Sequence, residues 1–178
     1  MRRLILLRHA KTRRESASGI DRDRALDERG RGDAATMGVW LARTNHRPDL
    51  VFVSTATRAR ETWDLMAPSL PATRKENVAD LYGAGPQELL QIIHSAEPDD
   101  PGSLMIVGHN PGLHELALGL ATKGEAAARQ ELSSHLPTTG VAIIDFPGDW
   151  TNVALGKGNL LLFMSPKLLK ETSGSIRR

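Results

Sequence analysis

Three runs of four apolar residues constrain the fold of this chain more than any other feature. They span residues 4–7, 50–53 and 104–107. Runs so short and so uniformly apolar predict strands that are buried on both faces, as in a parallel sheet. The stretches between them carry apolar residues at helical spacing, so the sequence predicts strand–helix–strand units with right-handed crossovers.

Helices are predicted on both sides of these strands. The first begins at Asp27, which is a favourable N-cap residue. Its glycines at 30, 32 and 38 weaken the helix but would let it pack close to the sheet. Further helices are predicted from Ser54 or Thr55 to about residue 66, from Pro86 to residue 96, over 111–120 and over 123–134.

The remaining segments complete a single domain. A short strand is expected near residues 77–79, and residues 141–146 and 150–155 predict a hairpin around Pro147-Gly148-Asp149. A last strand is expected over 159–164. The prediction is therefore an α/β domain over residues 1–171, a three-layer sandwich whose mixed, mostly parallel central sheet has helices on both faces. Residues 172–178 are expected to form a disordered tail.

Composition narrows the possible partners and compartments. The net charge is only +2 and no long basic block occurs, so nucleic acid is not an expected partner. The absence of cysteine excludes disulfide bonds and thiolate chemistry and fits a reducing compartment. Arg8 interrupts the N-terminal apolar stretch too early for a signal peptide, and no run reaches membrane-spanning length. We therefore expect a cytoplasmic protein that does not bind a membrane.

Basic and imidazole side chains follow each of the three apolar runs. Arg8 and His9 follow the first, Arg58 lies shortly after the second, and His109 follows the third. Because open α/β sheets bind ligands at the carboxyl ends of their strands, these four side chains are expected to share one anion site. Two arginines and two histidines around one anion suggest phosphate chemistry. The other histidines are expected to be structural or exposed; they are His46, His94, His114 and His135.

The same residues carry a family resemblance. Leu6-Leu7-Arg8-His9-Ala10 resembles the Arg-His-Gly signature of the histidine phosphatase superfamily, which is related to the phosphoglycerate mutases. Residues 54–62 resemble its second motif, and Val107-Gly108-His109-Asn110 resembles its third. Their order and spacing are similar to those of the compact, SixA-type branch of phosphohistidine phosphatases. The resemblance covers nearly the whole chain and implies a phosphoglycerate mutase-like fold.

The resemblance also implies a mechanism without metal or cofactor. His9 would be the nucleophile that receives the phosphoryl group, and Arg8, Arg58 and His109 would hold the phosphoryl oxygens. Water would then attack phospho-His9 and release free phosphate. The attacking ring nitrogen must be unprotonated, which neighbouring arginines should favour. A hydrogen-bond acceptor must also fix the ring tautomer, and the sequence does not identify it.

Two further residues are weaker candidates. Asp80 lies nearest the place where larger relatives carry a leaving-group acid, but a loop-capping role competes with that interpretation. Arg24 is expected either to contact the phosphate or to be a surface charge. A phosphohistidine substrate depends less on an enzyme acid, because its imidazole leaving group carries its own proton. The role of the arginine-rich loop over residues 12–24 stays open.

Three functions remain after this reasoning. The preferred one is removal of a phosphoryl group from phosphohistidine on a signalling protein, since the connections between motifs are short and suggest an open site. The second is hydrolysis of small phosphate monoesters. The third, from a different class, is a phosphoprotein-binding module without catalysis. The oligomeric state is not predicted.

Overall fold

The computed structural model describes residues 1–175, in which one mixed sheet forms the centre of the molecule. Its strand order is β3-β2-β4-β1-β6-β7-β5. All strands run in the same direction except β6, which is antiparallel to both β1 and β7. The strands are β1 (Arg2–Arg8), β2 (Leu50–Ser54), β3 (Arg74–Val78), β4 (Ser103–Gly108), β5 (Ala121–Gly124), β6 (Val141–Phe146) and β7 (Gly158–Met164). The prediction of a mixed, mostly parallel sheet is confirmed.

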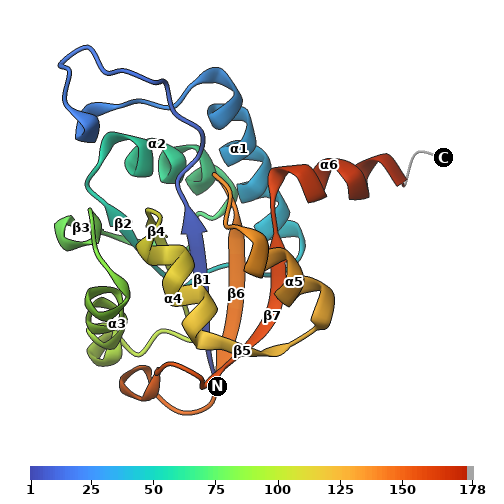
Figure 1. Cartoon of the computed structure of the whole chain (residues 1–178). Coiled ribbons are helices and arrows are strands. Elements are labelled where there is room, and N and C mark those ends of the chain that lie inside the picture. Colours follow the sequence, from blue (N-terminus) through green and yellow to red (C-terminus); the bar gives the residue numbers. More distant parts are fainter. Residues whose placement is uncertain (176–178) are drawn as a thin grey trace.

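Helices cover both faces of this sheet, which gives three layers (Figure 1). One face carries α1 (Glu28–Arg43), α2 (Thr57–Met66) and α6 (Pro166–Ser175), and the other carries α3 (Pro86–His94), α4 (Gly112–Leu120) and α5 (Ala126–Ser134). Side chains along β1 alternate between the two cores: Leu4 and Leu6 face one, and Ile5 and Leu7 face the other. This two-sided burial explains why the strand sequence is continuously apolar.

Local signals set the start and the packing of α1. The Asp27 carboxylate accepts a hydrogen bond from the Gly30 amide at 2.7 Å, so the predicted N-cap is confirmed. A Cβ atom at Gly30 would lie 2.0 Å from the Lys11 carbonyl oxygen, and one at Gly38 would lie 2.8 Å from the Met66 Cα. These two glycines therefore allow close packing, whereas Gly32 has no neighbour within 4 Å.

The predicted hairpin is wrong in its second strand. Residues 150–152 form a 3-10 turn instead, because the Trp150 indole is fully buried and donates a hydrogen bond to the Pro101 carbonyl at 2.8 Å. The antiparallel partner of β6 is β7, reached through a longer connection. Residues 121–124, assigned in part to a helix, form β5, and α5 begins only after Gly124, whose φ of +130° breaks the helical path.

Three smaller expectations also need correction. The N-cap of α2 is Ala56 and not Ser54 or Thr55, since the Ser54 hydroxyl is used elsewhere. The edge strand β3 begins at Arg74, ahead of the predicted residues 77–79, because it pairs along the whole of β2. Helix α6 continues to Ser175, so residues 172–175 do not belong to a disordered tail; the hydroxyls of Thr172 and Ser173 bond to carbonyls one turn back. Residues 176–178 of the predicted tail lie outside the described part of the chain.

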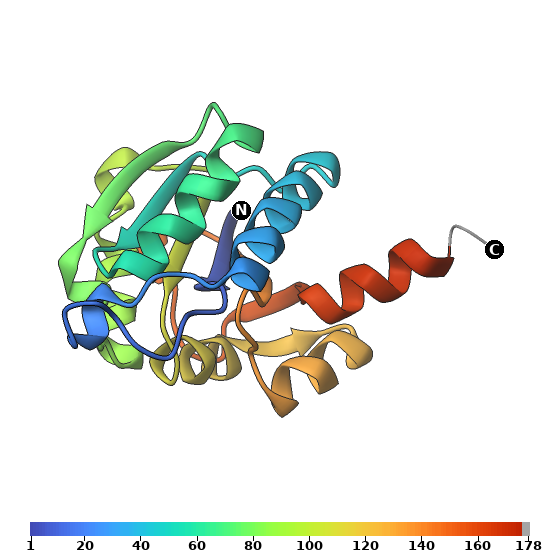
Figure 2. The ribbon, with the colours of Figure 1, turned by 90° about the horizontal axis from the view of Figure 1, so that it is seen from above.

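Within residues 1–175, no helix is both long and apolar enough to cross a lipid bilayer. The α6 helix leads away from the sheet at the C-terminal end of the described chain, as Figure 2 shows.

Candidate active site

The carboxyl ends of three neighbouring strands bring the predicted site residues together. In the order β2-β4-β1, these strands end at Ser54, Gly108 and Arg8, and His9 and His109 follow directly. The His9 amide donates to the Gly108 carbonyl at 3.0 Å, which fixes the two strand ends side by side. As a result, the rings of His9 and His109 lie with their centroids 5.2 Å apart.

The surroundings of His9 determine its tautomer and its charge. Its ring is buried, and Nδ1 lies 2.8 Å from the Ala10 carbonyl oxygen. A carbonyl only accepts, so Nδ1 carries the proton and Nε2 keeps its lone pair. Burial, together with the charges of His109, Arg58 and Arg8, lowers the pKa of His9 to about 3. The ring is therefore neutral and nucleophilic at Nε2 near neutral pH.

The peptide group of Ala10, which bonds to the His9 ring, is in turn hydrogen-bonded to α2. The Ala10 amide donates to the Thr62 hydroxyl at 2.9 Å, and that hydroxyl donates to the Arg58 carbonyl at 2.7 Å. The Thr139 amide lies 3.0 Å from the Arg8 carbonyl oxygen on the other side. The chain around His9 is thus anchored by a hydroxyl from one helix and by the loop before β6.

A second hydrogen-bonded chain orients His109. The Ala56 amide donates to the Ser54 hydroxyl at 3.3 Å, and Ser54 Oγ lies 2.7 Å from His109 Nε2. If the hydroxyl donates to Nε2, the ring proton lies on Nδ1, which is buried and makes no hydrogen bond within the described chain. Burial and the charge of Arg58 lower the pKa of His109 to about 4, so this ring is also neutral. Its Nδ1–H is a donor suited to an anion oxygen.

Two guanidinium groups give the site its positive charge. The Arg58 side chain is only 9% exposed, and Arg8 donates through Nη1 to the Leu136 carbonyl at 3.2 Å. Burial and the charge of Arg58 lower the pKa of Arg8, although an arginine remains charged at any working pH. The Arg8 Nε is buried without a hydrogen-bond partner among the described residues. A buried and a half-buried guanidinium with an unused donor favour a bound oxyanion.

Asp21 and Tyr82 belong to this site although the sequence did not single them out. The Asp21 side chain accepts from Arg58 Nη2 at 3.1 Å and from the Tyr82 hydroxyl at 2.7 Å. The Tyr82 ring meets His109 edge-on, with centroids 5.5 Å apart. Asp21 begins the 3-10 turn Asp21–Asp23 in the loop after β1 and belongs to no sequence motif. The only available signal for Tyr82 was that it is the one tyrosine of the chain.

The two weaker candidates lie further out. Arg24 pairs with Asp21 at 3.0 Å and donates to the Arg13 carbonyl at 3.0 Å, so it reaches Arg58 only through Asp21. Asp80 is exposed on the 3-10 turn Ala79–Leu81, in a groove that it shares with Tyr82. In the described structure, it makes no hydrogen bond or ion pair with the two arginines and two histidines. The acid role of Asp80 stays a prediction.

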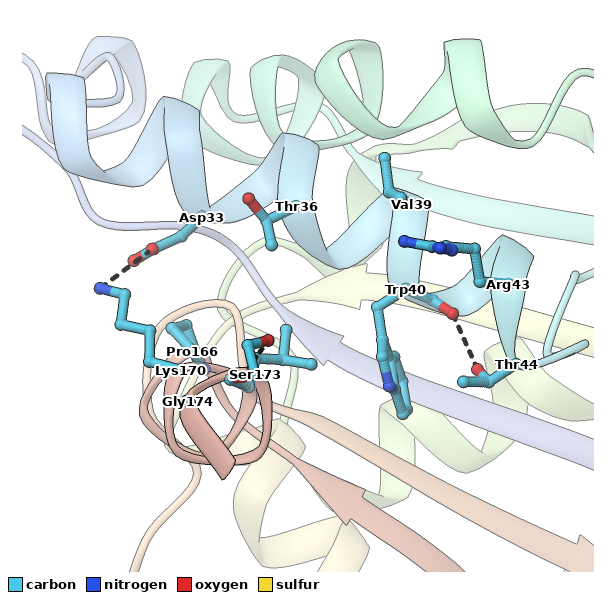
Figure 3. Close-up of a pocket in the computed structure, with 11 residues that line it drawn as sticks. Asp33, Thr36, Val39, Trp40, Arg43, Thr44, Pro166, Lys170, Ser173 and Gly174 are labelled. Atoms are coloured by element: carbon cyan, nitrogen blue, oxygen red, sulfur yellow. Dashed lines mark hydrogen bonds and ion pairs between the residues drawn. The ribbon is translucent and has the colours of Figure 1, made fainter. Parts of the chain in front are cut away.

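A separate groove of about 590 Å³ lies between α1 and α6 (Figure 3). It is lined by Trp40 and Pro166 and is crossed by the Asp33–Lys170 ion pair at 3.9 Å. It contains none of the paired arginines and histidines described above. Among residues 1–175, no group of three or more His, Asp or Glu side chains could hold a metal ion.

Fold and site together define a class: an α/β protein with a positively charged site, suited to a phosphoryl group, at the carboxyl ends of its central strands. Comparison with known proteins agrees with this class. A model described as the histidine phosphatase superfamily (branch 1) matches residues 4–83. The uncharacterized protein Rv1276c of Mycobacterium tuberculosis is 36% identical over 164 residues, which covers 90% of this chain and 100% of that protein. The chain belongs to the histidine phosphatase superfamily, and this membership supports phosphatase activity.

Solved structures show the same fold. The candidate phosphohistidine phosphatase SixA from Agrobacterium tumefaciens is 28% identical with a TM-score of 0.78, over 93% of this chain and 98% of that one. The candidate phosphohistidine phosphatase SixA from Nakamurella multipartitia is also 28% identical, with a TM-score of 0.79 over 93% of this chain and 96% of that one. The expected phosphoglycerate mutase-like fold is confirmed.

Proposed function

We propose that this protein is a phosphohistidine phosphatase that works through a covalent phospho-His9 intermediate. The observation that carries the proposal is the state of His9: a neutral ring with Nδ1–H held by the Ala10 carbonyl and Nε2 free, beside His109, Arg8 and Arg58. The proposed substrate is a phosphorylated histidine on a protein. The resemblance of the chain to proteins named SixA supports this substrate class.

In the first step, His9 Nε2 attacks phosphorus and the bond from phosphorus to the leaving group breaks. The electron pair of that bond goes to the leaving group. Arg8, Arg58 and the Nδ1–H of His109 hold the three phosphoryl oxygens, over which negative charge is spread in the transition state. The Nδ1 proton of His9 stays on its bond to Ala10, so the phosphorylated ring carries a positive charge and is itself a good leaving group.

In the second step, water attacks phosphorus on the side vacated by the first leaving group. The bond between phosphorus and His9 Nε2 breaks, its electron pair returns to the ring, and inorganic phosphate departs as dihydrogen phosphate with the oxygen and both protons of the water. The neutral imidazole is thereby restored. Neither step requires a group that this chain does not contain.

The ionised state of Asp21 favours phosphohistidine over a phosphate ester as the substrate. Hydrogen bonds from Tyr82 and Arg24, with the charge of Arg58, lower the pKa of Asp21 to about 2. A carboxylate with this pKa cannot donate a proton to an ester oxygen near neutral pH. An imidazole leaving group that already carries a proton does not need such a donor.

The test combines substrate comparison with chemical trapping. We expect turnover of a histidine-phosphorylated protein to exceed that of a sugar phosphate and an aryl phosphate. Brief reaction with labelled substrate should yield an acid-labile, alkali-stable adduct that His9→Ala abolishes. Label on a serine or aspartate would contradict the mechanism, and preference for a small ester would favour the monoester phosphatase. Phosphate binding without turnover on any substrate would favour the non-catalytic binding module.

A matched pair on α2 tests the anion site. Arg58→Ala should lower kcat/KM by about 10²–10³-fold, as expected when a donor to the transition-state oxyanion is removed. Arg60→Ala removes the same charge two residues later, from an exposed position whose one hydrogen bond is a 3.5 Å contact to Thr57. It should change kcat/KM by less than about twofold. Equal losses in both variants would contradict the assignment of Arg58.

A further inference from the structure

Asp21 places a half-exposed carboxylate directly against the buried guanidinium of the site. Its side chain is 53% exposed, whereas that of Arg58 is 9% exposed. Arg58 bonds to Asp21 twice, through Nη1 to the backbone carbonyl at 2.8 Å and through Nη2 to Oδ2 at 3.1 Å. The carboxylate therefore lies between the buried Arg58 guanidinium and solvent.

Asp21 is linked to His109 through the Tyr82 ring. The side-chain partners of Asp21 are Arg24, Arg58 and Tyr82, and Tyr82 packs its ring against His109. His9 bonds to the Ala10 carbonyl, and its ring centroid lies 5.2 Å from that of His109. Phosphoryl transfer places the attacking and leaving atoms in line, so the leaving group lies on the side of phosphorus away from His9. Asp21 is the half-exposed carboxylate that contacts the phosphoryl-binding Arg58.

The groups that face Asp21 keep it ionised and leave it acceptor capacity. Arg24 comes from its own loop, Arg58 from α2, Tyr82 from the segment after β3, and His109 from the end of β4. Arg22, from the same loop, lies over the Tyr82 ring. The neighbouring Asp23 accepts a hydrogen bond from the Ser18 hydroxyl at 2.6 Å. A carboxylate accepts about four hydrogen bonds, and Oδ1 has a single side-chain partner, Arg24, at 3.0 Å.

We propose that Asp21 is a specificity-determining residue that accepts a hydrogen bond from the protonated ring nitrogen of a phosphohistidine leaving group. The inference rests on the proposed function and names the group that selects the substrate. In the substrate, one ring nitrogen is bonded to phosphorus and the other carries a proton. When the phosphorus–nitrogen bond breaks, its electron pair neutralises the imidazolium, and the proton stays on the nitrogen that Asp21 holds.

A phosphate ester gains nothing from this carboxylate. Its leaving oxygen needs a proton, which an ionised Asp21 cannot supply, and the ester offers no N–H to accept. The selectivity should therefore depend on pH. An imidazole ring titrates near neutral pH, and a neighbouring carboxylate favours its protonated form. Asp21 should extend the hydrolysis of phosphohistidine to higher pH and leave ester hydrolysis unaffected.

The experiment measures kcat/KM of Asp21→Asn on a histidine-phosphorylated peptide and on an aryl phosphate, from pH 6 to 9. Asparagine keeps the size and a carbonyl acceptor for Arg58 and Tyr82. We expect a loss of about tenfold or more on the peptide, the scale of one charge-assisted hydrogen bond. This loss should grow with pH, while the aryl phosphate changes by less than about threefold.

Asp23→Asn is the matched control, since it removes the same charge from the same 3-10 turn and should leave both substrates unaffected. Equal losses of Asp21→Asn on both substrates would mean that Asp21 only positions Arg58, and would overturn the inference, as would no loss at all. A parallel drop in both pH profiles would do the same. If the unmodified enzyme hydrolyses the aryl phosphate but not the peptide, the result contradicts the proposed function, and the inference about Asp21, which depends on that function, is overturned as well. Thermal unfolding shows whether each variant is folded.

Discussion

The hydroxyl of Ser54 lies 2.7 Å from Nε2 of His109, across the boundary between β2 and β4. It also accepts from the Ala56 amide, and its own proton remains available for the imidazole. When the hydroxyl donates to Nε2, the proton of His109 lies on Nδ1, the nitrogen that is free to meet a phosphoryl oxygen.

Ser54→Ala should therefore lower kcat/KM by about tenfold, because His109 would lose the partner that selects its tautomer. The measurement is steady-state kinetics on an aryl phosphate. Ser165→Ala is a suitable control: that hydroxyl is also buried but bonds to the first turn of α6, at the Leu168 amide. An unchanged rate in Ser54→Ala would show that His109 needs no orientation by the serine.

Thr62 offers a separate test of how the His9 peptide is held. Thr62→Val keeps the shape but removes the hydroxyl that bridges the Ala10 amide and the Arg58 carbonyl. The Ala10 amide, buried and without a partner, should cost about 1–3 kcal/mol of unfolding free energy. Chemical denaturation measures this cost. Thr62→Ser retains the hydroxyl and should keep most of the stability. If both variants lose the same unfolding free energy, the effect comes from packing and not from the hydrogen bonds.

Stability should fall as the solution becomes mildly acidic. The folded pKa values of His9 and His109, about 3 and 4, lie below the unfolded value of 6.5. Below about pH 6.5 the unfolded chain binds protons that the folded chain does not, so the unfolding free energy decreases as the pH falls toward about 4. Burial also lowers the pKa of His46, which acts in the same direction. The slope is up to about 1.4 kcal/mol per pH unit for each histidine.

Urea unfolding at several pH values between 7 and 4.5 measures this slope. His9→Asn removes one titrating ring and should make the dependence shallower. An unfolding free energy that stays constant down to pH 4.5 would contradict the burial of two neutral imidazoles. Asp21 does not contribute in this range, because its pKa of about 2 in the folded chain matters only below about pH 4.

Two glycines of α1 should respond to alanine in opposite directions. Gly30→Ala would place a methyl group 2.0 Å from the Lys11 carbonyl, so the helix or the loop must shift. We expect a loss of about 1–3 kcal/mol and reduced activity, since Lys11 follows the site residues His9 and Ala10. Gly32→Ala meets no atom within 4 Å and should stabilise the helix by about 0.5–1 kcal/mol. Melting temperatures distinguish the two variants. Destabilisation by both substitutions would mean that helix geometry, and not contact with neighbouring atoms, determines their effect on stability.

Much of the fold could be predicted because its signals are local. A buried parallel strand is apolar at every position, so residues 4–7, 50–53 and 104–107 were recognisable without any knowledge of their partners. The second strand of the hairpin was not predictable in this way. The apolar character of Trp150 and Val153 reflects burial under a 3-10 turn and not strand pairing.

The same division holds for the site. Arg8, His9, Arg58 and His109 could be proposed because each stands at a fixed distance from the end of a strand, and parallel strands place their ends at one edge. Asp21, Tyr82 and the function of Ser54 could not be predicted. Their contacts join residues 37, 61 and 55 positions apart. Sequence pattern alone thus determined the central strands, most of the helices and the four groups proposed for the edge of the sheet, because secondary structure and strand ends depend on neighbouring residues. Only the folded chain decided which oxygen contacts each imidazole and which carboxylate pairs with Arg58, because those contacts exist only after distant segments have packed.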